Sequence, residues 1–317
     1  MNLFDLKGRV AIVTGGNGGI GLGMAKGMAS IGASIVVAGR NADKAADAVK
    51  QLQDMGAEAV FIPVDVSDDK SCADLIAASA AHFGRLDILI NNAGINNRKQ
   101  PHEYEMAEWR EVLDINLNSA FACCQAAYPH MQEAGGGKII NIGSMYSLFG
   151  GAFTVPYAAS KGGIVQMTKG LAAAWAKDNI QVNAVLPGWI DTELTQNARR
   201  VLSDLNDNVL RRTPAGRWGD IEDMAGIAAF LKDEDGYLLT EVARAIHDDF
   251  SIPEALPALA EILDRPNLSG EPLLRRVINA NFRVGRPEDA TRLARYAARK
   301  DAPQNMRTTA LAGLALW

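Results

Sequence analysis

Short apolar runs alternate with amphipathic stretches over the first 230 residues of the chain. Six runs rich in Val and Ile are typical of buried strands, at residues 9–15, 34–39, 59–66, 86–94, 138–144 and 180–188. Between them lie helical patterns, such as those at 42–55 and 158–177. This alternation predicts right-handed crossovers and an α/β fold, with a doubly wound parallel sheet covered by helices on both faces.

The pattern changes after Asp233. No β-branched run follows, and apolar residues recur at helical spacing in about five segments separated by proline or glycine. The chain therefore divides into two domains, residues 1–232 and residues 233–317, of which the second is an all-α tail.

Composition and charge exclude several classes of function. Hydrophobic residues at 48% and charged residues at 22% fit a globular protein, and a net charge of −5 gives no basic surface for nucleic acid. Three cysteines are too few for a disulfide framework. The N-terminus lacks the pattern of a signal peptide, and no apolar run approaches the ~20 residues that cross a bilayer. We expect a cytoplasmic protein with no nucleic-acid or membrane partner.

Metal chemistry is not expected either. His102 and His130 have no partners at metal-ligand spacing, and the sequence contains no Cys/His cluster.

The segment TGGNGGIG, residues 14–21, follows the first predicted strand and opens a helix. Glycines at this spacing let the backbone turn tightly and approach a pyrophosphate, while the helix N-terminus offers N–H donors. The segment predicts a dinucleotide site on a Rossmann-like fold. Its candidate cofactor-binding residues are Thr14, Gly15, Asn17, Gly19, Ile20 and Gly21.

The end of the second strand bears on the choice of cofactor. Gly39 and Arg40 stand where an acidic residue would bind the adenosine ribose of NAD(H), and Arg40 can pair with a 2′-phosphate instead. NADP(H) is therefore the favoured cofactor. NAD(H) remains the alternative, because Arg40 can also be a solvated arginine at the start of a helix. Asp65, with Val66 beside it, either accepts from the adenine amino group or caps the next helix.

The segment SMYSLFGGAFTVPYAASK carries the candidate reaction chemistry. Tyr157 and Lys161 are four residues apart, so they share one face of a helix. An ammonium beside a phenol should lower the tyrosine pKa toward working pH, as a general acid for carbonyl reduction requires. Ser144, at the end of the fifth strand, can hydrogen-bond the substrate oxygen.

Residues 5–231 resemble the short-chain dehydrogenase/reductase family. The motifs that carry the resemblance occur in the family's order: Thr14-Gly15-x-x-x-Gly19-x-Gly21, Asn91-Asn92-Ala93-Gly94, Asn116, Ser144, Tyr157, Lys161 and Pro187-Gly188. The resemblance implies an NADP(H)-dependent oxidoreductase that interconverts a ketone and a secondary alcohol, with Tyr157 as general acid/base. The alternative is a cofactor-binding scaffold or recognition protein with a helical interaction tail and little or no catalysis.

The resemblance also implies roles for single residues. Lys161 would hold the nicotinamide ribose, Ser144 would position the carbonyl, and Asn116 would support a water in the proton relay. Further implied cofactor contacts are Asn92, Gly94, Tyr157, Pro187, Gly188, Ile190 and Thr192.

A narrower likeness is to the gluconate 5-dehydrogenase and deoxyketogluconate dehydrogenase members of the family. It rests on AGRNADKA, TKGLAAAWAKDNIQVNAVLPGWIDTEL and RTPAGRWGD, and it implies a polyol, sugar acid or related keto compound as substrate. Arg98 is a candidate clamp for a substrate carboxylate, or else an exposed loop arginine. Met145, Tyr146 and Trp189 either shape the pocket wall or only pack. Residues 191–212 would form the mobile lid of this family.

The C-terminus departs from the family pattern. The usual seventh strand, which ends in Asp-Gly-Gly, is missing, and the segment from Tyr237 has a helical stripe instead. The tail resembles HEAT-type helical repeats. The family's tetramer uses the seventh strand at one interface, and long helices around 105–132 and 157–178 build the other. We therefore expect a homodimer, or a homotetramer if the tail replaces the missing contacts.

Overall fold

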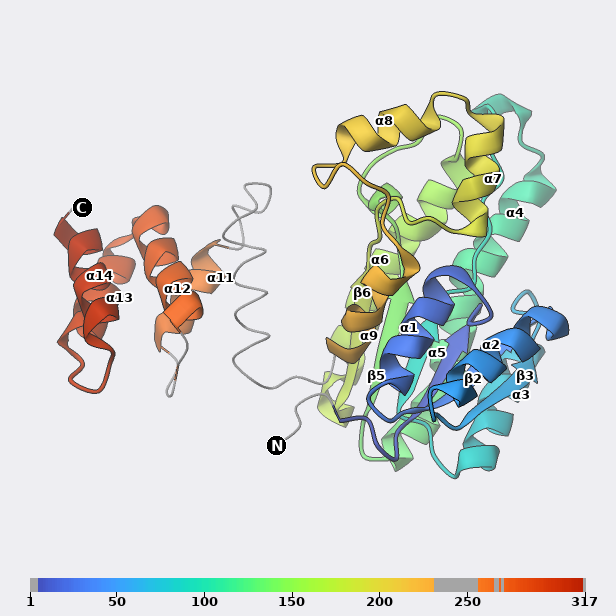
Figure 1. Ribbon diagram of the computed structural model, residues 1–317, viewed down its shortest axis with the longest axis horizontal. Coiled ribbons are helices and arrows are strands. Elements are labelled where there is room, and N and C mark those ends of the chain that lie inside the picture. The colour runs from blue at the N-terminus through green and yellow to red at the C-terminus, as the bar shows by residue number, and fades with distance from the viewer. Residues whose placement is uncertain (1–4, 231–255, 265–267, 269–270, 316–317) are drawn as a thin grey trace. The chain divides into compact units, whose positions relative to one another are not determined.

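The computed structural model describes residues 5–230, 256–264, 268 and 271–315 (Figure 1). The chain forms two compact units, Met1–Lys232 and Asp233–Trp317. The predictions that concern residues 231–255, namely the missing seventh strand and the helix beginning at Tyr237, lie outside the described residues.

A six-stranded sheet organises the first unit, in the order β3-β2-β1-β4-β5-β6, and every pair of neighbours is parallel. The strands are β1 (Val10–Thr14), β2 (Ser34–Gly39), β3 (Ala59–Pro63), β4 (Ile88–Asn91), β5 (Gly137–Ile142) and β6 (Ile180–Val185). Each corresponds to one of the six apolar runs of the sequence, so the predicted α/β fold class and the six predicted strands are confirmed.

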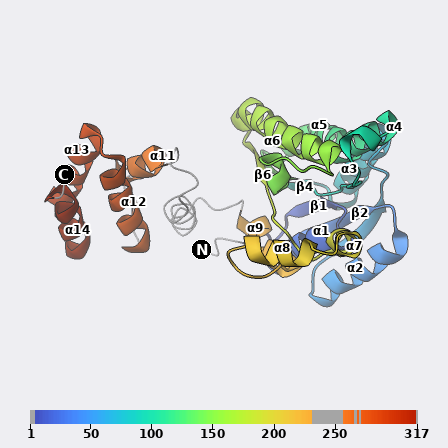
Figure 2. The same cartoon turned by 90° about the horizontal axis from the view of Figure 1, so that it is seen from above.

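Helices cover both faces of this sheet (Figure 2). One face carries α1 (Gly19–Ala29), α2 (Ala42–Asp54) and α9 (Ala225–Phe230), and the other carries α3 (Asp69–Phe83), α5 (Ser119–Glu133) and α6 (Val155–Trp175). Each face has its own apolar core, which includes Val13 and Met28 on the first side and Ile12 and Leu89 on the second. Burial on both faces explains why the strands are apolar at nearly every position.

Helix α1 packs very closely against the turn before α9 and the first residue of α9. A Cβ atom on Gly23 would lie 2.1 Å from the carbonyl oxygen of Ile221, and one on Gly27 would lie 2.2 Å from that of Ala225. Only glycine allows this approach. The same helix begins directly after the Gly-rich loop, so its packing also fixes the position of that loop.

The long helix expected at 105–132 is interrupted. It consists of α4 (Met106–Leu113), a π-helical turn (Asp114–Asn118) and α5. The N–H of Ser119 donates to the carbonyl of Asp114, five residues back. Such π turns occur often at functional sites, and this one carries Asn116.

The strand order reverses between β1 and β4, which lie side by side at the centre of the sheet. In sheets of this kind ligands bind beyond the carboxyl ends of the strands at such a switch point. The loops after β1, β4, β5 and β6 all emerge at this edge. Helices α7 (Glu193–Val201) and α8 (Leu205–Arg212) follow β6 (Figure 1).

The second unit has an apolar core of its own. Its described helices are α11 (Leu256–Glu261), α12 (Glu271–Val284), α13 (Pro287–Ala298) and α14 (Gln304–Ala315). Leu273, Val277 and Leu293 are among the core residues. No helix in the described parts of either unit is long and apolar enough to cross a bilayer.

Candidate active site

The loop after β1 is tied to the loop after β4. The hydroxyl of Thr14 accepts from the backbone N–H groups of Asn92 at 3.0 Å and Ala93 at 3.1 Å. In return, the Asn92 side-chain amide donates to the carbonyls of Thr14 at 3.0 Å and Gly15 at 3.2 Å. Thr14 and Asn92 therefore use these groups to hold the two loops together at the switch point.

The Gly-rich loop leaves a cradle that side chains would fill. A Cβ atom on Gly21 would lie 2.5 Å from the carbonyl oxygen of Gly15, and one on Gly15, where φ is +64°, would lie 2.9 Å from the Asn92 amide nitrogen. Gly18 has no heavy atom within 4 Å of its Cβ position. In the described structure no side chain caps α1, and its first turn has no acidic residue. These residues fit a dinucleotide pyrophosphate.

The adenosine side of the cradle lies at the ends of β2 and β3. Arg40 is exposed directly after β2, and Asn17 lies against Gly39. Asp65 accepts from the backbone and hydroxyl of Ser67, at 3.0 and 2.7 Å. These bonds, together with the charge of Arg40, hold the Asp65 pKa below its ordinary value.

One of the two interpretations of Asp65 is wrong. The residue that caps the next helix, α3, is Asp68, whose carboxylate accepts from the N–H of Lys70 at 3.1 Å. Asp65 closes a short turn with Ser67 instead. Val66 packs against the core beneath it.

The candidate catalytic residues come from three elements. Ser144 follows β5 and begins a short 3-10 turn, Met145–Ser147. Tyr157 and Lys161 lie one turn apart on α6, with the Lys161 ammonium 5.7 Å from the centre of the Tyr157 ring. Ser144 lies close enough to Tyr157 to favour the ionised form of its phenol. The Lys161 ammonium is buried and donates to the carbonyl of Ile142 at 2.6 Å.

Asn116 fixes the backbone that follows β4. Its side-chain oxygen accepts from the N–H of Ile95 at 2.8 Å, and its amide donates to the carbonyl of Ile95 at 2.9 Å and to Ser160 at 3.1 Å. A Cβ atom on Gly94 would lie 3.2 Å from the Asn116 oxygen and 3.6 Å from the Lys161 nitrogen. Gly94 thus lets Asn116 and Lys161 converge.

The expected lowering of the Tyr157 pKa is wrong for this structure. Burial raises the pKa of Tyr157 above its ordinary value, and the nearby Ser144 hydroxyl and the positive charge of Arg98 only partly oppose this. Burial also lowers the pKa of Lys161 to about 8. The charge that favours the phenolate belongs to Arg98, which the sequence placed on the substrate side only.

Arg98 lies among aromatic side chains. Burial lowers the pKa of its guanidinium, and the nearby hydroxyls of Tyr146, Tyr157 and Tyr104 oppose this. Within the described residues Arg98 forms no ion pair, although other arginines of the same unit do. A partly desolvated guanidinium of this kind favours an anionic ligand.

An aromatic wall extends away from Tyr157. The ring of Tyr146 lies 6.3 Å from that of Tyr157 and 6.4 Å from that of Trp189, and the ring of Trp218 lies 5.6 Å from that of Trp189. The sequence identified Tyr146 and Trp189 but missed Trp218, whose contact depends on two segments that are not neighbours in the chain. Met145 is 41% exposed and donates its N–H to the carbonyl of Pro187.

The segment after β6 contacts the glycine-rich loop that forms the cofactor cradle. Thr192 begins α7, and its methyl group lies 3.3 Å from the Cβ position of Gly19. Ile190 is buried and pairs with Gly219, whereas Gly188 has open space around its Cβ position.

The exposed ion pair of Lys44 and Glu193 joins the first turns of α2 and α7. Sequence reasoning missed this pair, because 149 positions separate its members. No cluster of three metal-ligating side chains was found in the described regions.

Comparison with known proteins agrees with this geometry. The family model for short chain dehydrogenases matches residues 9–202. The chain is 40% identical over 232 residues to gluconate 5-dehydrogenase of Gluconobacter oxydans, which covers 73% of this chain and 90% of that protein. It is 39% identical over 227 residues to cis-4-hydroxycyclohexanecarboxylate dehydrogenase of Sinomonas cyclohexanicum, with 71% and 90% covered.

A solved structure agrees as well. A gluconate 5-dehydrogenase from Burkholderia cenocepacia, in complex with NADP and tartrate, matches with a TM-score of 0.69 and 40% identity over 73% of this chain and 91% of that one. The chain described here therefore belongs to the short-chain dehydrogenase/reductase family.

Proposed function

We propose that the chain is an NADP(H)-dependent oxidoreductase that interconverts a ketone and a secondary alcohol. The observation that carries this proposal is the convergence of Ser144, Tyr157 and Lys161 beside the glycine-lined cradle. When bound, the nicotinamide supplies a hydride in reduction and accepts one in oxidation.

The chain's own residues handle the proton and the carbonyl. Ser144 binds the carbonyl oxygen, and the Tyr157 hydroxyl gives that oxygen its proton in reduction and takes it back in oxidation. Lys161, with a pKa of about 8, carries its charge at neutral pH and lies one helical turn from Tyr157. Asn116 holds the backbone at Ile95 and so fixes the position of Gly94 beside the Lys161 side chain.

NADP(H) is the proposed cofactor, and NAD(H) is the alternative. Arg40 is exposed at the end of β2, where no carboxylate follows directly to repel a 2′-phosphate. The related structure from Burkholderia cenocepacia was solved with NADP. Comparing the KM for NADPH with that for NADH would separate the two.

The proposed substrates are hydroxy and keto acids. Arg98 is partly desolvated beside Tyr157 and can bind a carboxylate. The relatives from Gluconobacter and Sinomonas are named for gluconate and for a cyclohexanecarboxylate, which both carry a carboxyl group and a secondary hydroxyl.

Replacing Tyr157 by Phe tests the catalytic proposal. We expect the rate of ketone reduction to fall by at least about 100-fold, because the general acid is lost, while the Kd for NADPH changes little. The rate is measured by NADPH absorbance and the Kd by NADPH fluorescence. Equal turnover by the variant would remove Tyr157 from the mechanism. Tight NADPH binding without turnover of any ketone by the unmodified chain would favour the scaffold alternative.

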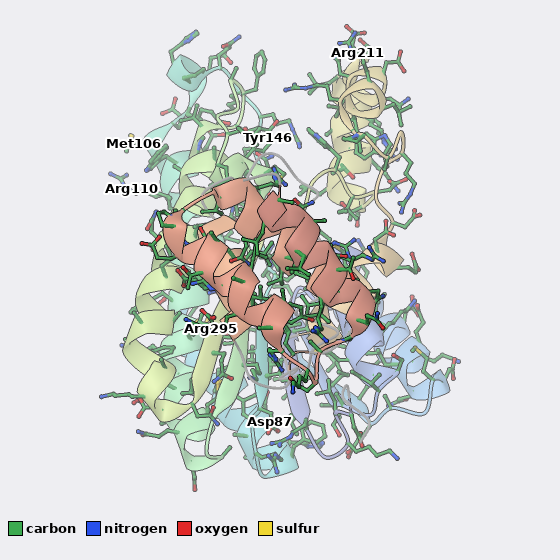
Figure 3. The ribbon with its side chains drawn as sticks, turned by 90° about the vertical axis from the view of Figure 1, so that its left-hand side faces the viewer. Asp87, Met106, Arg110, Tyr146, Arg211 and Arg295 are labelled. Atoms are coloured by element: carbon green, nitrogen blue, oxygen red, sulfur yellow. The ribbon has the colours of Figure 1, made fainter. Side chains whose placement is uncertain are left out.

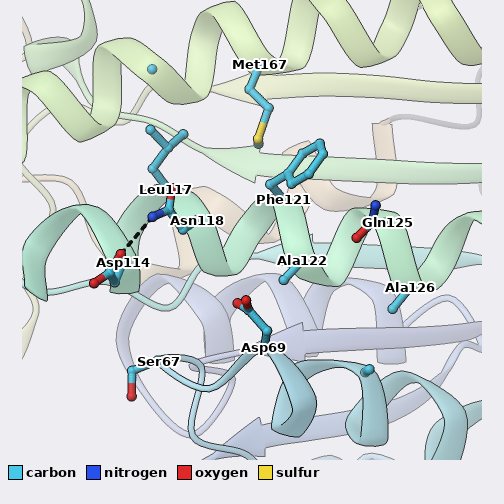
Figure 4. A pocket seen from close by; sticks show the side chains of 12 residues that line it. Ser67, Asp69, Asp114, Leu117, Asn118, Phe121, Ala122, Gln125, Ala126 and Met167 are labelled. Atoms are coloured by element: carbon cyan, nitrogen blue, oxygen red, sulfur yellow. Dashed lines mark hydrogen bonds between the residues drawn. The ribbon is translucent and has the colours of Figure 1, made fainter. Parts of the chain in front are cut away.

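We also propose that the chain forms a homodimer through α5 and α6. A groove of about 870 Å³ lies on this face, and Leu117, Phe121 and Met167 point into it (Figure 4). Phe121 is 45% exposed, which suits an apolar residue at a subunit contact.

The three buried free cysteines fit a reducing compartment, so the cytoplasm is the proposed location.

Replacing Phe121 by Arg tests the dimer, because a charge at the contact would be desolvated without a partner. We expect the molar mass from light scattering to fall from that of a dimer to that of a monomer. Met55→Arg is the control, since Met55 is also 45% exposed but lies at the end of α2. A monomeric unmodified chain would contradict the proposal.

A further inference from the structure

The segment between Ser144 and Tyr157 exposes several apolar side chains to the solvent. Residues 145–156 include no Asp, Glu, Lys, Arg or His. Five of their side chains, here called the apolar rim, are substantially exposed: Met145 (41%), Leu148 (65%), Phe149 (62%), Phe153 (45%) and Val155 (37%). Exposed apolar groups that adjoin a reacting site mark a surface that meets a ligand or partner.

The rim's backbone is held in place. The N–H groups of Leu148 and Phe149 donate to the carbonyl of Met145 at 3.1 and 3.0 Å, and Thr154 donates to Gly151 at 3.2 Å. Two polar side chains of the segment turn inward, since Ser147 donates to the carbonyl of Lys161 at 2.7 Å and Thr154 is 5% exposed, whereas Tyr146 lies beside Tyr157. The rim therefore offers an incoming ligand few hydrogen bonds.

The rim is joined to the loop that carries Arg98. The carbonyl of Phe153 accepts from the N–H of Lys99 at 3.1 Å and lies 3.0 Å from the hydroxyl of Tyr104. That hydroxyl also donates to Asn97 at 2.6 Å. The backbone at Phe153 is thus fixed to the loop of Arg98, whose guanidinium lies near the hydroxyls of Tyr146 and Tyr157. Tyr146 is labelled in Figure 3.

This arrangement selects among carboxylic acids. A polyhydroxylated chain placed on the rim would lose hydrogen bonds to water that the rim cannot replace, whereas an apolar skeleton gains by burial there. We propose that the substrate is a keto or hydroxy acid with an apolar carbon skeleton, alicyclic or aliphatic, whose carboxylate binds Arg98 and whose skeleton packs on the rim. This substrate class rests on the oxidoreductase function proposed above.

Four ketones separate the two halves of the proposal. 4-Oxocyclohexanecarboxylate has an apolar skeleton and a carboxylate, and cyclohexanone has the skeleton alone. 5-Keto-D-gluconate has a carboxylate on a polyhydroxylated chain, and D-fructose has the polyhydroxylated chain alone. We expect kcat/KM for NADPH-dependent reduction to be highest for 4-oxocyclohexanecarboxylate, by about 10-fold or more over 5-keto-D-gluconate.

Three variants of the full chain assign the preference to residues. Phe153→Ser and Phe149→Ser should each lower kcat/KM for 4-oxocyclohexanecarboxylate by about 10-fold and leave that for 5-keto-D-gluconate within about twofold. Arg98→Gln should instead lower kcat/KM for both acids by about 100-fold and that for cyclohexanone by about 10-fold or less, because cyclohexanone loses only the effect of the Arg98 charge on Tyr157. Met55→Ser is the matched control, because Met55 has the same 45% exposure as Phe153 but ends α2 at the opposite edge of the sheet.

The outcomes distinguish this inference from the function on which it rests. Preference for 5-keto-D-gluconate, or an unchanged ratio of the two acids in Phe153→Ser and Phe149→Ser, would overturn the apolar-skeleton proposal and leave the oxidoreductase function standing. No reduction of any of the four ketones by a chain that binds NADPH would overturn both.

Discussion

At the residue scale, Lys161 is a buried cation without a carboxylate partner among its described contacts. Burial lowers its pKa from the ordinary 10.5 to about 8. The unfolded chain therefore binds more protons than the folded chain between about pH 8 and 10.5. The cost of burying the ammonium is fully present below pH 8 and disappears as the pH rises to about 10.5.

Replacing Lys161 by Met removes this buried charge. We expect turnover to be lost while the free energy of unfolding at pH 7 rises by up to roughly 3 kcal/mol, and the stability gain should shrink by pH 10. Urea unfolding at the two pH values measures this. Lys169→Met is the control, because Lys169 lies exposed on the same helix. A gain that is equal at both pH values would show that burial of the charge is not its origin.

Tyr157 shows that a catalytic residue can be predicted while its energetics are not. The sequence placed Lys161 one helical turn away from Tyr157, and the structure confirms that spacing. The pKa direction was wrong, because it depends on how deeply neighbouring segments bury the phenol and on Arg98, 59 positions earlier in the chain.

At the element scale, the crossing of α1 with the segment 221–225 depends on two glycines. Gly27→Ala would place a Cβ atom 2.2 Å from the carbonyl oxygen of Ala225. We expect this variant to lose about 2 kcal/mol or more of stability through overpacking, and to bind NADPH more weakly because α1 carries the Gly-rich loop.

Gly226→Ala is the matched control for that substitution. Gly226 is the second residue of α9 and follows Ala225 directly. It has no heavy atom within 4 Å of its Cβ position. It should be neutral or stabilising, since alanine favours helix. Thermal unfolding with and without NADPH measures both effects, and equal stability of the two variants would mean that the crossing tolerates a wider separation.

The ends of elements were harder to predict than their interiors. The helical pattern at 42–55 predicted the bounds of α2 to within one residue, because that pattern depends only on local periodicity. The break at Asp114–Asn118 was missed, since nothing in the local pattern marks a π turn. Asp65 was offered as a cap, but Asp68 takes that place.

At the scale of the whole molecule, the two units have separate apolar cores. In the first unit Asp87, which is labelled in Figure 3, is buried. Arg85 and Arg9 bind its carboxylate. In the second, Asp289 is fully buried and accepts from Arg286 at 2.9 Å and from Arg292 at 2.6 Å. Burial alone would raise the Asp289 pKa, but these arginines hold it below its ordinary value.

Two compact units with separate cores predict two unfolding transitions in calorimetry. NADPH should raise the Tm of the transition of the first unit, because a ligand stabilises only the unit that binds it. Asp289→Asn should lower the Tm of the other transition by leaving two arginines with a weaker partner, at a cost of about 2 kcal/mol or more. A single transition that responds to both NADPH and Asp289→Asn would show that the two units unfold as one.

The sequence by itself determined the strand–helix order, the sheet class, the Gly-rich loop and the family. These follow from local quantities: the apolar period, glycine at a turn, and a tyrosine and lysine one helical turn apart. The HEAT-like character of residues 233–317 stays a prediction.

Only the tertiary structure decided what surrounds the reacting groups. Segments far apart in sequence fold to one edge of the sheet. Their packing determines the raised pKa of Tyr157, the tyrosines near Arg98, and the exposure of Phe149 and Phe153. Burial and electrostatic potential sum over all neighbours in space, and a linear pattern does not specify those neighbours.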